Sequence, residues 1–195
     1  MKIQLNSSSD TILPHSIPQE VVAQLLTHLD SLPAHVKRMV ILLLLTGIRV
    51  NKLCSLPFDC LIRHETGIWF LGVDNLKTHV EYTIPLSSIA EKIILEQQQA
   101  LKQDQQGASD LLFLNAKGQP VSPKTFLVQL NRLAIKKDIR DTTGQVWRFQ
   151  AQQFRSSFIE QSIKANVPLN VLTHLLGHKT QSTILRYFHG PQYLL

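Results

Sequence analysis

The sequence predicts a mainly α-helical domain with a small antiparallel β-sheet. Apolar residues recur with helical spacing in several stretches, whereas residues 61–85 are rich in β-branched and aromatic side chains. A length of 195 residues with 44% hydrophobic content suits one domain with a substantial core. We therefore expect a single domain over residues 16–195, and a linker or N-terminal arm over residues 1–15, where no amphipathic period is visible.

Two helices are expected at the start of this domain. Ser16 and Gln19 have the spacing of a capping box, which predicts a helix start there. One apolar face follows, made of Val21, Val22, Leu25, Leu26 and Leu29. That helix should end near Pro33, and a second helix should run from about Ala34 to Gly47, a residue type that commonly ends helices.

The segment 61–85 should form about three antiparallel strands. Residues typical of turns interrupt it at Glu65-Thr66-Gly67 and at Asp74-Asn75, which indicates two short hairpins. A glutamine-rich helix should follow over about residues 88–106. The stretch Gln97-Gln98-Gln99 is interpreted as one solvated face of that helix.

The rest of the chain should be helical. Ser122-Pro123 is a typical helix start, and this helix should run to about Lys137. Three further short helices are expected, with breaks at Pro168 and Gly177. Within them a core-facing set with helical spacing is formed by Phe154, Phe158, Ile159 and Ile163.

Composition limits the class of protein. Twenty Lys and Arg against 14 Asp and Glu give a net charge of +6, which favours a polyanionic partner. Cys54 and Cys60 form no CxxC pair, so neither a disulfide framework nor a thiolate metal site is indicated. The longest apolar run is too short to cross a bilayer and the N-terminus lacks signal-peptide order, so we expect a cytoplasmic protein without membrane association. His174 and His178 lack a third ligand, and neither a metal nor another cofactor is expected.

Two arginines are candidates for phosphate binding. Arg49 directly follows Gly47 and Ile48, where a guanidinium can point into a groove and donate two hydrogen bonds to a phosphate. Arg155 should lie on a helix near the other end of the chain. Two such forks could clamp one phosphate. Taken alone, however, Arg49 is better interpreted as a surface cation at a helix C-terminus, where the helix dipole favours it.

Five short motifs, taken in order, resemble those of the tyrosine recombinases, the phage integrase family. They read Thr46-Gly47-Ile48-Arg49, Leu76-Lys77-Thr78, Gln152-Gln153-Phe154-Arg155, Leu175-Leu176-Gly177-His178 and Thr183-Ile184-Leu185-Arg186-Tyr187-Phe188-His189. Each motif is weak alone, but five in the family's order over about residues 16–190 are specific. The chain resembles the catalytic domain of a transposon-encoded or Xer-like member, a DNA breaking-rejoining domain that is mainly helical with a small sheet.

The resemblance implies strand transfer through a 3′-phosphotyrosine. Tyr187 would attack the scissile phosphate, while Arg49 and Arg155 would stabilise the transition state. Lys77 would donate a proton to the leaving 5′-oxygen, and His178 would hydrogen-bond a nonbridging oxygen. DNA contacts are expected from Arg49, Lys77, Arg148, Arg155, Lys179 and Arg186. The other tyrosines, Tyr82 and Tyr193, are interpreted as ordinary half-buried aromatic residues.

Two positions depart from the family pattern. Gln152 stands where the family has the His of H-x-x-R, and its amide can donate a hydrogen bond to phosphate but cannot exchange a proton. Lys52 stands where many members have a Glu that supports local packing. These departures motivate one alternative, a recombinase-derived DNA-binding protein that no longer cleaves. A second alternative is relaxation of supercoils by type IB topoisomerase-like chemistry.

The resemblance also implies partners. The expected ligand is double-stranded DNA, bound weakly and with strong salt dependence because the sequence has no separate N-terminal DNA-binding domain. Family members assemble as tetramers on paired DNA sites, which we expect here as a homotetramer. Only eight residues follow Tyr187, too few for a full exchanged helix, so a monomer is expected without DNA.

Overall fold

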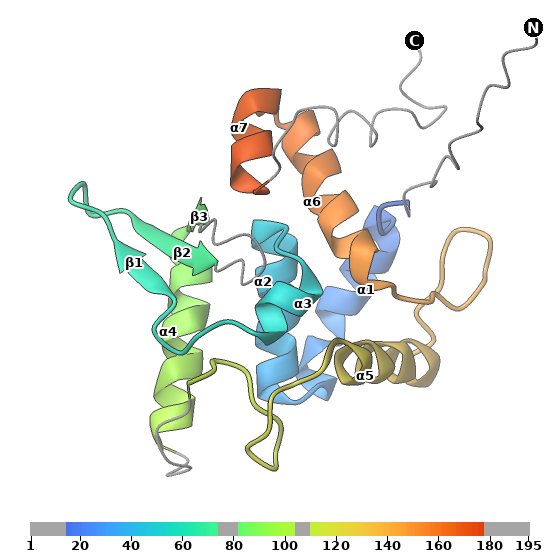
Figure 1. The fold of residues 1–195 in the computed structure, drawn as a ribbon. Helices are drawn as coiled ribbons and strands as arrows, with labels where there is room; N and C mark the ends of the chain where they lie inside the picture. Colours follow the sequence, from blue (N-terminus) through green and yellow to red (C-terminus); the bar gives the residue numbers. More distant parts are fainter. Residues whose placement is uncertain (1–14, 74–81, 104–109, 178–195) are drawn as a thin grey trace, which may run out of the picture.

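The fold is given by a computed structural model that describes residues 15–73, 82–103 and 110–177. Within these residues the chain forms seven α-helices, one 3-10 helix and a three-stranded antiparallel sheet. The helices make up most of the molecule, and the sheet lies at one edge beside α4 (Figure 1). The predicted mainly α architecture with a small sheet is therefore confirmed.

The N-terminal helices are α1 (Gln19–Thr27), the 3-10 turn η1 (Leu29–Ser31) and α2 (Ala34–Thr46). The predicted capping box at the start of α1 is wrong. Pro18 occupies the N-cap, and the hydroxyl of Ser16 donates instead to the carboxylate of Glu160 on a distant helix. The predicted end of α2 is confirmed, because Gly47 caps it in the left-handed conformation.

A short helix that the sequence did not reveal, α3 (Val50–Cys54), separates α2 from the sheet. The strands are β1 (Leu61–Arg63), β2 (Trp69–Val73) and β3 (Tyr82–Pro85), in the order β1-β2-β3. The prediction of about three antiparallel strands is confirmed. The expected turn at Glu65-Thr66-Gly67 is present, with Gly67 at positive φ, whereas Asp74-Asn75 lies outside the described residues.

The glutamine-rich helix α4 (Ser88–Gln103) packs against α2, and one prediction about it is wrong. Gln97 is 3% exposed and lies inside the protein. Its side-chain oxygen accepts a hydrogen bond from Arg38 at 2.9 Å, and its nitrogen donates to the carbonyl of Leu112 at 3.0 Å. The residue is buried because the segment around Leu112 crosses α4 and needs a polar partner for its backbone.

The C-terminal half contains α5 (Pro123–Lys136), α6 (Ala151–Lys164) and α7 (Leu169–Leu175). Ser122 caps α5 as predicted, since its hydroxyl oxygen accepts a hydrogen bond from the backbone N–H of Thr125 at 3.1 Å. The break at Pro168 is also confirmed. The third short helix predicted for this half would lie beyond Gly177, outside the described residues.

Buried apolar residues form one large cluster and one small one. The large cluster contains residues from each of the helices α1 through α5, from the sheet and from the first turn of α6, where Phe154 is fully buried. The small cluster contains Ile159, Leu172 and Leu176, and it packs α7 onto α6. The helix α6, which carries the predicted Arg155, therefore belongs to both clusters, whereas the buried apolar residues of α7 belong to the small one.

Candidate functional site

The turn after α2 is fixed by its own sequence. The hydroxyl of Thr46 donates to the carbonyl of Leu42 at 2.6 Å and accepts from the backbone N–H of Ile48 at 3.3 Å. Gly47 has φ of 61°, and a Cβ there would come within 2.4 Å of the Phe158 ring on α6. Both conditions exclude a side chain at position 47, so the Thr-Gly-Ile pattern sets how closely α2 and α6 approach.

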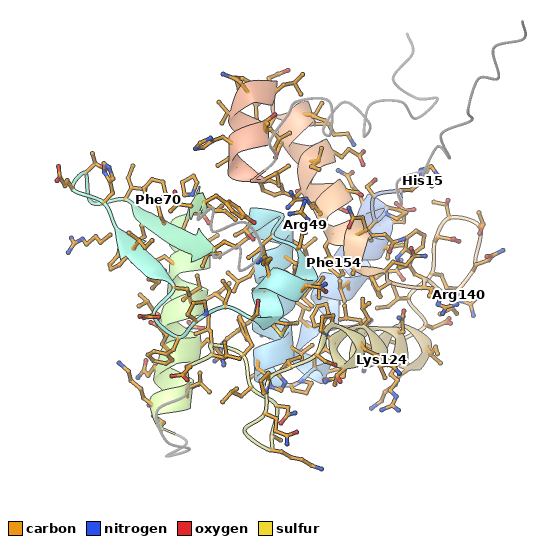
Figure 2. The ribbon with its side chains drawn as sticks, viewed as in Figure 1. His15, Arg49, Phe70, Lys124, Arg140 and Phe154 are labelled. Carbon is orange, nitrogen blue, oxygen red and sulfur yellow. The ribbon has the colours of Figure 1, made fainter. Side chains whose placement is uncertain are left out.

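Arg49 lies at the exposed end of this turn. It is the N-cap of α3, with extended backbone, and its side chain is exposed while its neighbours Ile48 and Val50 are buried. In Figure 2 it lies where α2, α3 and α6 come together. Arg49 is thus an exposed cation two residues beyond the Gly47 cap of α2, and a new helix starts immediately after it.

Arg155 is the most deeply placed cation of the site, with 1% of the residue exposed. Its Nη1 donates to the carbonyl of Gly47 at 2.8 Å, and its Nη2 donates to the carbonyl of Leu176 at 2.6 Å. A guanidinium has five N–H donors in a fixed fork, so it can join two carbonyls and still present an edge to a ligand. Arg155 therefore ties the end of α2 to the end of α7.

The end of α7 contributes a second close backbone contact. Gly177 has φ of 60°, and a Cβ there would lie 2.9 Å from two ring carbons of Tyr82, the first residue of β3. Strand β3 and helix α7 are accordingly in contact. The Leu-Gly pair that precedes His178 is thus held by Arg155 from one side and by the Tyr82 ring from the other.

The electrostatics of Tyr82 connect these parts. Burial raises the pKa of its phenol, and the positive charges of Arg155 and Arg49, together with hydrogen bonding by Arg155, act against that rise. The phenol thus stays protonated and close to both guanidinium groups. The sequence predicts Tyr82 only as an ordinary half-buried aromatic residue, because no spacing rule shows which charged residues lie near β3.

Three other residues that the sequence motifs single out lie near Arg49 or Arg155 along the chain. Gln152 is half-buried in the first turn of α6, one turn before Arg155, and its carbonyl accepts a hydrogen bond from the Ser156 hydroxyl at 3.2 Å. Arg148 is exposed in the segment that leads into α6. Lys52 is half-buried on α3, three residues after Arg49.

Five predicted site residues lie outside the described residues. They are Lys77, His178, Lys179, Arg186 and Tyr187. The structure therefore brings together Arg49 and Arg155 through Gly47, and it describes the backbone up to the residue before His178. The roles of the remaining residues stay predictions.

Other chemistries find no support in the described part of the chain. No group of three or more His, Cys, Asp or Glu residues there could hold a metal ion. Cys54 and Cys60 are buried free thiols, and burial raises the pKa of each to about 12. No helix among the described residues is long and apolar enough to cross a membrane.

Comparison with known proteins identifies similar sequences. The model of the phage integrase family matches residues 15–192. The chain is 31% identical over 176 residues to transposase B from transposon PsiTn554 of Staphylococcus aureus, a match that covers 90% of this chain and 28% of that protein. It is 30% identical over 184 residues to tyrosine recombinase XerD of Haemophilus ducreyi, covering 91% of this chain and 58% of that one. The chain thus spans about a quarter to three fifths of the length of such relatives.

Solved structures share the fold. A crystal structure of the XerH site-specific recombinase bound to difH substrate, in a pre-cleavage complex, matches with a TM-score of 0.72 and 19% identity, over 92% of this chain and 51% of that one. The XerA recombinase matches with a TM-score of 0.75 and 18% identity, over 93% and 63% of the two chains. At this identity the likeness establishes the fold.

Proposed function

Because the chain belongs to the phage integrase family, we propose that it is the catalytic domain of a site-specific DNA recombinase, spanning residues 16–195. It would cleave and rejoin DNA strands through a 3′-phosphotyrosine. The observation that carries this proposal is the turn at Gly47, which presents Arg49 at the surface while its carbonyl holds the buried guanidinium of Arg155. Two cations placed around one turn suit a phosphodiester whose negative charge grows in the transition state.

The proposed roles of Arg49 and Arg155 differ because their burial differs. Arg49 is exposed and can reach the DNA backbone directly, whereas Arg155 is buried and oriented by hydrogen bonds to two backbone carbonyls. Preorganised donors of this kind stabilise a developing charge without a further cost of reorientation. Tyr187 is the proposed nucleophile, Lys77 the proposed acid for the leaving oxygen, and His178 a proposed donor to a nonbridging oxygen.

Gln152 determines how the proton of the nucleophile is handled. Its place in the first turn of α6, one turn before Arg155, suits a donor to the same phosphate. An amide cannot accept the proton of Tyr187, so the loss relative to a histidine would be about 10²–10⁴-fold if that proton must be removed by this side chain. Cleavage that persists with Gln152 would mean that the cations alone lower the barrier enough.

The substrate and assembly are proposed from the relatives. Double-stranded DNA is the proposed partner, contacted by Arg148, Lys179 and Arg186 in addition to the catalytic cations. A likeness to transposase B suggests a mobile element as the DNA that is moved. We propose a homotetramer on paired sites and a monomer without DNA. A DNA substrate would place the protein at the nucleoid of the cytoplasm.

The test is covalent attachment to DNA. The chain is incubated with a nicked, labelled oligonucleotide library, denatured, and examined for labelled protein. Attachment is expected for the wild type and for Tyr193→Phe, a matched control in the same C-terminal segment, and should vanish in Tyr187→Phe. Attachment that survives in Tyr187→Phe would overturn the assignment of the nucleophile.

One alternative has a specific observation in its favour. Gln152 would suit a DNA-binding protein of recombinase descent that no longer cleaves. In that case neither the wild type nor Tyr193→Phe would attach, whereas Gln152→His would. Relaxation of a supercoiled plasmid by the isolated chain, without paired sites, would instead favour topoisomerase-like activity.

A further inference from the structure

We propose that Tyr82 is a further phosphate-binding residue, whose hydroxyl donates a hydrogen bond to the same oxyanion that Arg49 and Arg155 face. The inference rests on the proposed function for the identity of that oxyanion, a DNA phosphate. It adds to the site a residue on β3 that belongs to none of the five sequence motifs. Three observations carry it.

The ring of Tyr82 is fixed from two sides. Its backbone belongs to β3, which pairs with β2 through Val73. Its ring carbons lie against the backbone of Gly177, where a Cβ would come within 2.9 Å. A ring held between a strand and a helix end has few rotamers available, so the direction of its hydroxyl is set by the fold.

The hydroxyl is buried, and its O–H has no hydrogen-bond acceptor in the part of the chain that the structure describes. Arg155 acts on the phenol oxygen through its charge and as a hydrogen-bond donor, and a guanidinium cannot accept the proton of the phenol. A buried hydroxyl without a partner destabilises a fold, so such groups persist mainly where a ligand or a function requires them. This one is an unsatisfied donor inside the candidate site.

The charges around the hydroxyl define what could satisfy it. Arg155 and Arg49 are the charged groups that act on Tyr82, and no carboxylate among the residues with described positions adds to them. Burial keeps the phenol protonated, so it can donate a hydrogen bond. The Tyr82 hydroxyl is a neutral donor in a positively charged environment, so the acceptor that suits it best carries a negative charge. A phosphate oxygen is such an acceptor.

The experiment measures oxyanion binding without DNA. Orthovanadate, an analogue of phosphate, is titrated into the chain at constant ionic strength set with NaCl, and binding is followed by calorimetry. The variants are Tyr82→Phe, which removes only the hydroxyl, and Thr83→Val, which removes a hydroxyl from the exposed side of the same strand. Arg49→Ala serves as a reference for loss of the site.

We expect saturable binding by the wild type and by Thr83→Val, and binding about fivefold weaker or more in Tyr82→Phe, as for the loss of one hydrogen bond. The melting temperature of Tyr82→Phe without vanadate should equal or exceed that of the wild type, because the buried O–H has no acceptor there. Equal vanadate affinity in Tyr82→Phe would overturn the proposal. So would a lower melting temperature of that variant, which would indicate a structural bond, and so would a wild type that binds no vanadate.

The attachment assay separates this inference from the proposed function. Weaker vanadate binding in Tyr82→Phe together with no covalent attachment by the wild type would support the oxyanion site and refute cleavage. Attachment by the wild type with unchanged vanadate binding in Tyr82→Phe would support cleavage and refute the role of Tyr82. Where both hold, attachment by Tyr82→Phe should be at least about tenfold slower, because the hydrogen bond would strengthen in the transition state.

Discussion

The two backbone carbonyls that hold Arg155 belong to regions of very different packing. Gly47 ends α2, whose buried apolar residues all belong to the large cluster. Leu176 follows α7, a helix of seven residues whose buried contacts come from the small cluster with Ile159 and Leu172. The same guanidinium therefore joins a helix of the large cluster to a helix whose buried residues belong to the small one.

This difference predicts that the two ends of the site, at Gly47 and at Leu176, differ in their free energy of local opening. The free energy of local opening depends on how many apolar contacts and hydrogen bonds are lost. Opening at Gly47 requires the large cluster to come apart, whereas opening at Leu176 requires only that α7 separate from α6 and β3. The arginine side of the site should then be as stable as the whole protein, and the side that leads to His178 should open more readily.

The largest effect is expected at Gly47. In Gly47→Ala the free energy of unfolding should fall by about 2–5 kcal/mol, the sum of strain at positive φ and a clash with Phe158. Urea denaturation measures it. Gly144→Ala is the matched control, because Gly144 has φ of 81° and nothing lies within 4 Å of its Cβ position. If both variants lose the same amount, the close approach of α2 and α6 contributes nothing.

The comparison between the clusters is tested with two leucines, both fully buried. Leu42→Ala, in α2, should lower the global free energy of unfolding by about 2–5 kcal/mol. Leu172→Ala, in α7, should lower it less, because α7 can detach before the main cluster unfolds. Amide hydrogen exchange should instead speed up by about tenfold or more in residues 169–177 alone. Uniformly faster exchange over the whole chain in Leu172→Ala would show that the two regions unfold together.

The link between the regions is tested at Arg155. In Arg155→Lys one ammonium replaces a fork that reaches two carbonyls, and we expect a loss of about 1.5–3 kcal/mol in unfolding free energy. Hydrogen exchange at Leu176 and Gly177 should rise more than exchange at Gly47. Arg148→Lys, an exposed change of the same type, should stay within about 0.5 kcal/mol of the wild type. Equal losses in the two variants would contradict the anchoring role.

The smallest effect is expected for the two thiols. Burial raises the pKa of Cys54 and Cys60 to about 12, so at pH 8 about one thiol in 10⁴ is ionised while the protein is folded. Alkylation by iodoacetamide should follow opening of the large cluster, to which both residues belong. Leu172→Ala should leave the rate unchanged and Leu42→Ala should raise it. A faster rate in Leu172→Ala would place the thiols in the region that α7 stabilises.

Local sequence rules predicted much of the fold. Gly47 at the end of α2 and Ser122 at the start of α5 follow from backbone conformation and capping, which depend on neighbouring residues. The same rules were wrong at Ser16, whose hydroxyl bonds to a helix far along the chain. They were also wrong at Gln97, where a crossing segment supplies the buried partner. Contacts between distant segments leave no local period in the sequence.

In the candidate site too, local motifs predicted some residues, whereas contacts between distant segments could not be predicted. Arg49 and Arg155 were predicted from motifs, because residue type and order carry the resemblance. That Arg155 would bond to the carbonyls of Gly47 and Leu176 was not predictable, since a carbonyl belongs to every residue. Tyr82 was missed because the relevant facts, its neighbours across β3 and α7, exist only in three dimensions.

The two carbonyl bonds of Arg155 also have a thermodynamic consequence for any ligand. Suppose that a ligand binds Arg155 only while the guanidinium is bonded to both carbonyls, that is, while α7 is docked. By thermodynamic linkage, docking of α7 then increases the affinity for the ligand, and the ligand stabilises docked α7 by the same free energy. If α7 is docked half of the time, the apparent affinity is about twofold lower than with α7 always docked. If α7 is docked one tenth of the time, the apparent affinity is about tenfold lower. Mutations in the small cluster would thus tune ligand affinity from positions that never touch the ligand.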